Sequence, residues 1–236
     1  MSIRISDSYI SRLLVGDMNR SLSQLLDQQR MASTLQRVNS YADDPRAVAS
    51  IARLNDLIDA NTGYLDNVGR SRVLVDGMDA ALQDLSGILA DLKVIALRES
   101  SGSASSQTMG ATLPEAEALR GRMLEILNTS VEGQYLFAGH MTDTAPFVDA
   151  GGTVMYRGDS GEIAATTGPH SSLVVNIPGD VFNQAGGYFA AVEELTAALT
   201  SGDATAVLAV VESLAQLEEH LGTLMVKVGG RQNDLD

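Results

Sequence analysis

The chain has 236 residues, a formal net charge of −14 and only 4% aromatic residues, and it contains neither Cys nor Trp. This acidic balance excludes a nucleic-acid partner, because phosphates are neutralised by clustered Lys and Arg. The lack of Cys excludes disulfides and thiolate chemistry and fits either the cytosol or a reducing export route. We expect neither membrane insertion nor a cleaved secretory peptide, because no apolar run approaches roughly 20 residues and the start has no basic segment followed by an apolar one.

Residues 9–38 have the pattern of an amphipathic helix. Their apolar side chains recur at steps of three and four, opposite a face of Ser, Gln, Asp and Arg: Ile10, Leu13, Leu14, Met18, Leu22, Leu25 and Leu26. Residues 1–42 carry five Arg against three Asp, so the acidity lies further along the chain. We expect this segment to stay mobile until neighbouring subunits cover an assembly interface formed by Ile10, Leu14, Met18, Leu22 and Leu25.

The stretch from Asn39 to Pro45 predicts an irregular turn, because Pro45 disfavours helical geometry at Asp44 and suits the first turn of a new helix. The pair Asp43 and Asp44 resembles an acidic metal pair, but a helix N-cap is the better interpretation, since a carboxylate there accepts backbone N–H groups.

A sustained heptad seam follows, which predicts a helix from 45 to 99 about 80 Å long. Its members are Leu54, Ile58, Asn61, Leu65, Val68, Arg72, Val75, Met78, Leu82, Leu85, Leu89, Leu92 and Ala96. Asn61 and Arg72 interrupt the apolar seam, and four Gly residues weaken the helix, so we expect a kink or break near 61–72.

The polar residues 100–111 predict a flexible connection to a further helix through Ala116, Leu119, Met123 and Ile126. Short apolar runs between 134 and 182, separated by Gly, Asp, Thr and Pro, predict strands and turns: Tyr135–Phe137, Val154–Tyr156 and Leu173–Ile177. After Gly187 a helical pattern resumes, is loosened at 201–203, and continues as a second seam able to face the first: Val207, Val210, Leu214, Leu217, Leu221, Leu224, Val228 and Leu235.

The sequence offers no convincing catalytic, cofactor or metal site. Gly158-Asp-Ser-Gly161 resembles the nucleophile segment of trypsin-like proteases, with His140 and His170 nearby, but one short β-rich stretch cannot supply a double barrel. Arg157-Gly-Asp159 spells a cell-adhesion tripeptide that a common turn composition produces by chance. His140, His170 and His220 lack the close spacing of metal ligands. A secreted hydrolase or adhesin using the Arg157–Ser160 turn is the alternative from another functional class.

Two sets of motifs resemble the flagellin superfamily. The first is the helix-turn signature between the first two long helices, with Arg37, Asn39, Asp43, Asp44 and Pro45. The second lies in the β region, where four motifs follow in the family's order and include Tyr135, Phe137, Gly139, Pro146, Phe147, Tyr156, Gly158, Asp159, Gly179 and Phe182. The Asp-Asp-Pro form is that of the superfamily's junction proteins, which join the hook to the filament, and flagellins proper usually follow the paired acids with small residues.

The resemblance implies a mainly α fold with a small β region: an elongated antiparallel bundle of long heptad-patterned helices carrying a β insert. It implies three parts, namely an N-terminal assembly helix (1–42) that forms an inner tube, a helical bundle (43–132 and 184–236) and a small β domain (133–183).

The resemblance also implies export through the flagellar type III apparatus to the extracellular flagellum. The implied partners are other flagellar axial proteins: neighbouring junction subunits, the adjacent hook-associated protein and flagellin. The alternative within the superfamily is a flagellin filament subunit. Family members continue for tens of residues beyond the position of Arg231–Leu235, so we expect this chain to be truncated, and the tail where the export chaperone binds the full-length protein to be absent.

Overall fold

The computed structural model describes residues 7–38, 44–101, 106–183 and 187–236. The chain divides into two compact units, Met1–Asn61 and Thr62–Asp236. The three-part division expected from the sequence stays a prediction.

In the first unit, helix α1 (Asp7–Thr34) confirms the amphipathic helix expected from the sequence, and helix α2 (Pro45–Glu99) begins. α1 ends where Leu35 adopts a positive φ of 55°, a left-handed conformation that costs a non-Gly residue energy. The break expected in α2 near 61–72 does not occur. Gly63 and Gly69 have open space around them, so each weakens the helix only by its own propensity, about 1 kcal/mol, which is too little to interrupt it.

Four helical segments form the bundle of the second unit: the part of α2 from Thr62, α3 (Ser106–Leu127), α4 (Tyr188–Ser201) and α5 (Ala204–Leu235). α3 begins inside the stretch expected to be a flexible connection, because Met109 is buried in the core and anchors its first turns. A left-handed Gly202 ends α4, and Asp203 caps α5 by accepting from the amides of Thr205 and Ala206.

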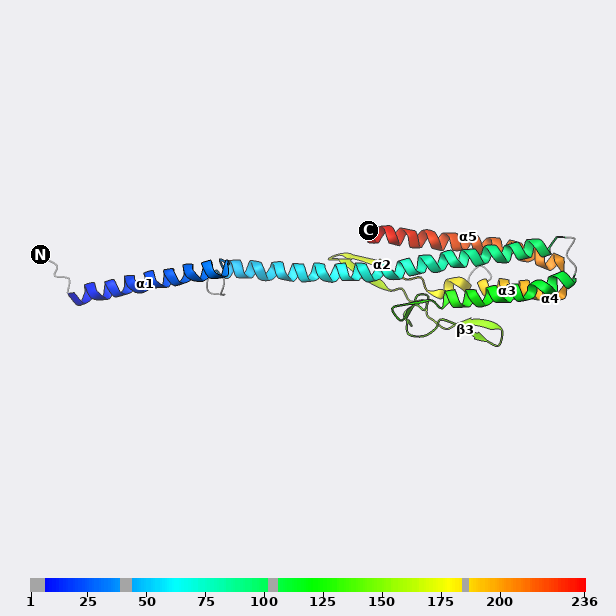
Figure 1. Ribbon diagram of the computed structural model, residues 1–236, viewed down its shortest axis with the longest axis horizontal. Helices are drawn as coiled ribbons and strands as arrows, with labels where there is room; N and C mark the ends of the chain where they lie inside the picture. The colour runs from blue at the N-terminus through cyan, green and yellow to red at the C-terminus, as the bar shows by residue number, and fades with distance from the viewer. Residues whose placement is uncertain (1–6, 39–43, 102–105, 184–186) are drawn as a thin grey trace. The chain divides into compact units, whose positions relative to one another are not determined.

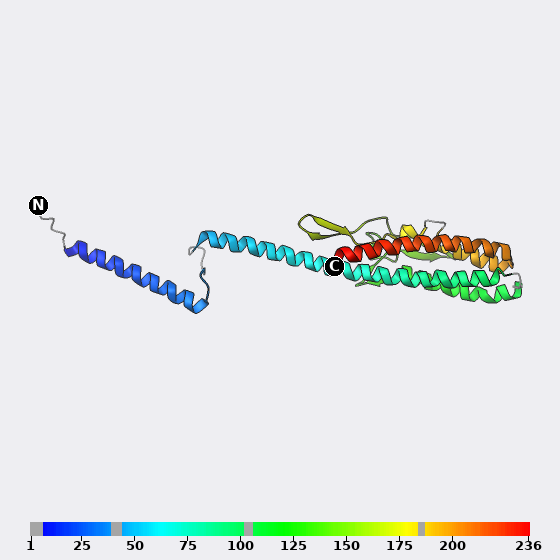
Figure 2. The same cartoon turned by 90° about the horizontal axis from the view of Figure 1, so that it is seen from above.

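α5 lies alongside α2 and runs antiparallel to it, in both views of the molecule (Figure 1; Figure 2). Three polar pairs cross between the two helices in this register: Arg72 with Asp236, Asp76 with Gln232, and Lys93 with Glu218. All eight predicted seam residues of α5 are buried, and so are the seven predicted seam residues of α2 from Val75 to Ala96. The facing seams are therefore confirmed over this length.

The first half of the α2 seam is different. Leu65 is 71% exposed in the second unit, and Leu54 and Ile58 in the first unit are 56% and 60% exposed. The two seams therefore face each other from Val75 to Ala96, whereas Leu54, Ile58 and Leu65 remain mostly exposed.

The segment between α3 and α4 carries the β region. Its described strands form three separate antiparallel hairpins rather than one sheet. These are β1 (Ser130–Val131) with β2 (Gln134–Tyr135), β3 (Phe147–Ala150) with β4 (Thr153–Tyr156), and β5 (Ala164–Gly168) with β6 (Ser171–Val174), followed by the short 3₁₀ helix η1 (Gly179–Asn183). The predicted strands at Tyr135–Phe137 and Leu173–Ile177 are shorter than expected, because Phe137 and Ile177 lie outside them in buried irregular segments.

Candidate functional site

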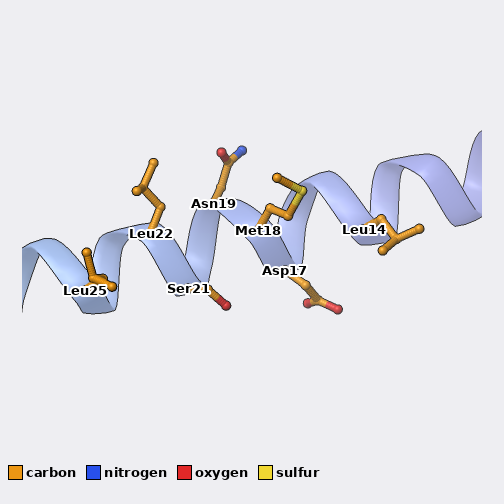
Figure 3. Close-up of a pocket in the computed structure, with 7 residues that line it drawn as sticks. All are labelled: Leu14, Asp17, Met18, Asn19, Ser21, Leu22 and Leu25. Atoms are coloured by element: carbon orange, nitrogen blue, oxygen red, sulfur yellow. The ribbon is translucent and has the colours of Figure 1, made fainter.

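The predicted assembly interface is an exposed apolar stripe along α1. Ile10, Leu14, Met18, Leu22 and Leu25 are between 46% and 69% exposed, although large aliphatic side chains are normally buried. A shallow hollow runs along this face, and Figure 3 shows that all the residues lining it stand on α1 itself. A hollow formed by a single helix does not enclose a small molecule, and an exposed apolar stripe is typical of a surface that packs against another helix or subunit, so the assembly interface stays a prediction.

The two units differ in net charge. Residues 1–61 contain seven Arg and seven Asp, so the entire net charge of −14 belongs to residues 62–236. On α1, Arg20 lies 3.4 Å from Asp17 and Arg30 lies 3.7 Å from Asp27, in exposed pairs that add little stability. The apolar stripe therefore lies on a segment without net charge.

Asp44 organises the start of α2. Its Oδ1 accepts from the Ala47 amide at 3.0 Å, as predicted for an N-cap, and its Oδ2 accepts from Arg37 Nη1 at 3.2 Å. These bonds, the Ala47 amide foremost and then Arg37, hold the pKa of the Asp44 carboxyl below its usual value. The signature residues Asn39 and Asp43 lie outside the described residues.

The β-region motifs, distant in sequence, meet in one aromatic cluster with the start of α4. Ring centroids lie 5.2 Å apart for Phe137 and Phe182, 5.2 Å for Phe147 and Tyr156, and 5.9 Å for Phe147 and Phe189. All four Phe residues of the chain belong to this cluster. The motifs therefore join the β region to the bundle through edge-to-face and tilted packing.

The hydroxyl of Tyr156 is the polar centre of this cluster. It lies 3.0 Å from the carbonyl oxygen of Phe137 and 2.8 Å from that of Asp159, and it accepts from the Gly179 amide at 3.1 Å. Burial raises the pKa of Tyr156 to about 12. A Cβ on Gly179 would lie 2.5 Å from the Tyr156 ring, which explains why the motif has Gly there.

The remaining motif residues lie in close turns and backbone contacts of the β region. Gly139 has φ of 70° and leaves no room for a Cβ against Asp159, and a Cβ on Gly158 would overlap Tyr156. The Pro146 carbonyl accepts from the Arg157 amide at 2.7 Å, and the Tyr135 amide donates to Thr142 at 2.9 Å.

The geometry disfavours the hydrolase and adhesin alternatives. Ser160 Oγ donates to Asp180 at 2.8 Å, whereas the His140 ring lies against the Glu162 carbonyl oxygen at 3.2 Å, so Ser160 has an acid and not an imidazole beside it. Asp159 Oδ1 accepts from the His140 and Gly161 amides at 2.7 and 2.9 Å, which ties the adhesion carboxylate into its own loop and lowers its pKa. Over the described residues, no three His, Asp or Glu side chains gather where they could hold a metal ion.

Sequence reasoning missed several polar anchors of the β region. Arg120 of α3 donates to Asp149 at 2.8 Å and to the Gly152 carbonyl oxygen at 2.5 Å, fixing the β3–β4 hairpin. Arg231 of α5 donates to the carbonyl oxygen of the buried Asn176 at 2.8 Å. Local sequence gives no sign of such contacts, because their partners are 29 to 55 residues away.

Long helices with an exposed apolar stripe and a motif-rich β region are typical of structural proteins. Residues 5–142, more than half of the chain, match the model of the bacterial flagellin N-terminal helical region. The chain belongs to this flagellin family. The part of the chain that the structure describes includes no helix apolar and long enough to cross a membrane.

Two curated relatives are both flagellar hook-associated protein 3. The one from Escherichia coli K12 is 24% identical over 75% of this chain, and the one from Salmonella typhimurium LT2 is 21% identical over 77%. The matches cover 56% and 57% of those proteins, so the chain spans little more than half of their length.

Solved structures share the fold. A Vibrio parahaemolyticus structure described as flagellar and hook-associated gives a TM-score of 0.77 at 22% identity, covering 84% of this chain and 91% of that one. The flagellar junction protein FlgL of Legionella pneumophila gives 0.67 at 15% identity, covering 81% and 94%. The mainly α bundle with a β insert expected from the sequence is therefore confirmed.

Proposed function

We propose that this chain is a structural subunit of the bacterial flagellum that joins the hook to the flagellin filament. Family membership supports the flagellum, and the names of the two curated relatives and of the Legionella structure support the junction. The observation that carries the assembly role is the exposed stripe of α1 on a segment without net charge. Its partners are other flagellar axial proteins: neighbouring copies, the adjacent hook-associated protein and flagellin. The protein reaches the extracellular flagellum through the flagellar type III apparatus and binds an export chaperone.

In this proposal the stripe is covered only when subunits assemble. Burying a Leu or Met side chain fully contributes about 1.5 to 3 kcal/mol, so the five stripe residues supply a substantial driving force for ordering the segment. In the isolated chain that force is absent. Hydrogen exchange over residues 9–30 should therefore be fast in the isolated chain, and strong protection there would contradict the mechanism.

A complementation experiment tests the assembly role. Leu22→Asp places a charge in the stripe, whereas Gln28→Glu changes the charge of α1 equally outside the stripe residues. In cells lacking the wild-type gene, we expect the first variant to leave hooks without filaments and the second to restore filaments. Filaments of normal length with Leu22→Asp would overturn the role of the stripe.

Self-assembly of the purified protein separates the proposed function from the filament alternative. A filament subunit polymerises into long filaments, whereas a junction subunit forms no more than a short ring. Long filaments made by this protein alone would replace the junction assignment with that of a flagellin.

A further inference from the structure

The last turns of α5 are held by an unusual set of polar contacts. Arg231 donates through Nη1 to the Asn176 carbonyl oxygen at 2.8 Å, and Gln232 donates to Asp76 of α2 at 2.9 Å. Arg231 is half-buried, and desolvation lowers the pKa of its guanidinium. Burying a charged donor is costly unless its hydrogen-bond partner is well placed, so this contact fixes the position of Arg231 relative to Asn176.

Asn176 extends the contact into the β region. Its side chain is buried, accepts from the Ile163 amide at 2.7 Å and donates to the Gly161 carbonyl oxygen at 2.8 Å. The segment that leads into β5 and the segment that leaves β6 are thereby bound to each other, and Arg231 is bound to the residue that joins them. Both the oxygen and the nitrogen of the Asn176 side-chain amide are needed for this connection between the two segments.

A second anchor reaches the same hairpin from α2. Asn67 Nδ2 donates to the Thr166 carbonyl oxygen in β5 at 3.0 Å. The hairpin is therefore bound to α2 through Asn67 and to α5 through Arg231. It bridges the two helices at the level where Arg72 of α2 pairs with Asp236.

We propose that the β5–β6 hairpin is a staple that holds the last turns of α5 on α2, with Arg231 and Asn67 as its positioning residues. The staple keeps Val228 and Leu235 covered in the isolated chain. It does not depend on the proposed junction role, because it acts within one chain.

Hydrogen exchange followed by mass spectrometry on the full chain tests the staple. Arg231→Met keeps the length of the side chain and removes the donor, Arg231→Lys keeps a charged donor, and Arg122→Met makes the first change at an exposed position of α3. We expect Arg231→Met to speed exchange at least about tenfold in both 164–174 and 228–235, as for the loss of a hydrogen bond from a charged group. Arg231→Lys should restore part of the protection, and α3 and α4 should be unchanged in all three variants.

Asn67→Ala provides an independent test from the other anchor, which also serves if Arg231→Met does not fold. It should speed exchange in the same two segments, although its substitution lies in α2. Unchanged exchange in both segments, a rise in only one of them, or an equal rise throughout the bundle would each overturn the staple.

Discussion

Two leucines of identical chemistry and opposite burial distinguish the folded core from the proposed assembly surface. Leu214 lies in the seam of α5 with no exposed surface, whereas Leu22 on α1 is 57% exposed. Leu214→Ala leaves a cavity in the packed seam, so we expect a loss of about 2 to 5 kcal/mol in the free energy of unfolding. Leu22→Ala removes side-chain atoms that are mostly in water, and we expect a change within about 0.5 kcal/mol.

Thermal and urea unfolding, followed by circular dichroism, measure both variants. A unit of this size shifts its melting temperature by about 2 to 4 °C per kcal/mol, so Leu214→Ala should lower the midpoint by about 4 to 20 °C. Leu22→Ala should leave the midpoint nearly unchanged and yet weaken assembly with the other flagellar proteins. A loss of stability in Leu22→Ala as large as in Leu214→Ala would refute the reasoning, because it would mean that the isolated chain already buries the stripe.

Three further predictions concern individual contacts. Because the Asp44 carboxyl has a lowered pKa in the folded chain, its contribution to stability is present above the unfolded pKa of about 3.9 and is lost as the pH falls through the folded value. Hydrogen exchange at the Ala47 amide should therefore accelerate in that acidic range. Asp44→Asn keeps a capping side chain and should abolish the pH dependence. Gly179→Ala should lower the melting temperature because its Cβ would lie 2.7 Å from the Phe137 carbonyl oxygen, whereas Gly87→Ala, at an open helical position, should raise stability by up to about 1 kcal/mol; equal effects would contradict the packing argument. Tyr156→Phe should cost about 1 kcal/mol in denaturant unfolding, since it removes the hydroxyl next to the Asp159 carbonyl oxygen, whereas the Gly179 amide keeps its bond to the Phe137 carbonyl oxygen; a neutral result would show that the hydroxyl has no structural role.

Hydrophobic periodicity predicted the helices and the apolar face of each, but not how much of that face is buried. Two positions of the α2 seam in the second unit illustrate the limit: Leu65 and Leu85 both belong to it, yet Leu65 is 71% exposed and Leu85 is fully buried. The spacing depends only on local sequence, whereas burial depends on where α5 lies. The cap at Asp44 could be predicted, because its partner amide is three residues away.

The organisation of the β region was harder to predict from local sequence than that of the helices. Its turns follow from Gly and Asp in the sequence, but its organisation into three separate hairpins follows from contacts that no local pattern encodes. The Tyr156 hydroxyl meets the Gly179 amide 23 residues further on, and Arg231 meets Asn176 across 55 residues. The resemblance identified Tyr156 and Gly179 as motif residues, and the structure supplies their physical role in the aromatic cluster.

Deletion of the gene, followed by electron microscopy of the cells, tests the proposed function most directly. The junction role predicts complete hooks without filaments and flagellin shed into the medium, because filament subunits then have no base on which to assemble. Cells with normal filaments would contradict it.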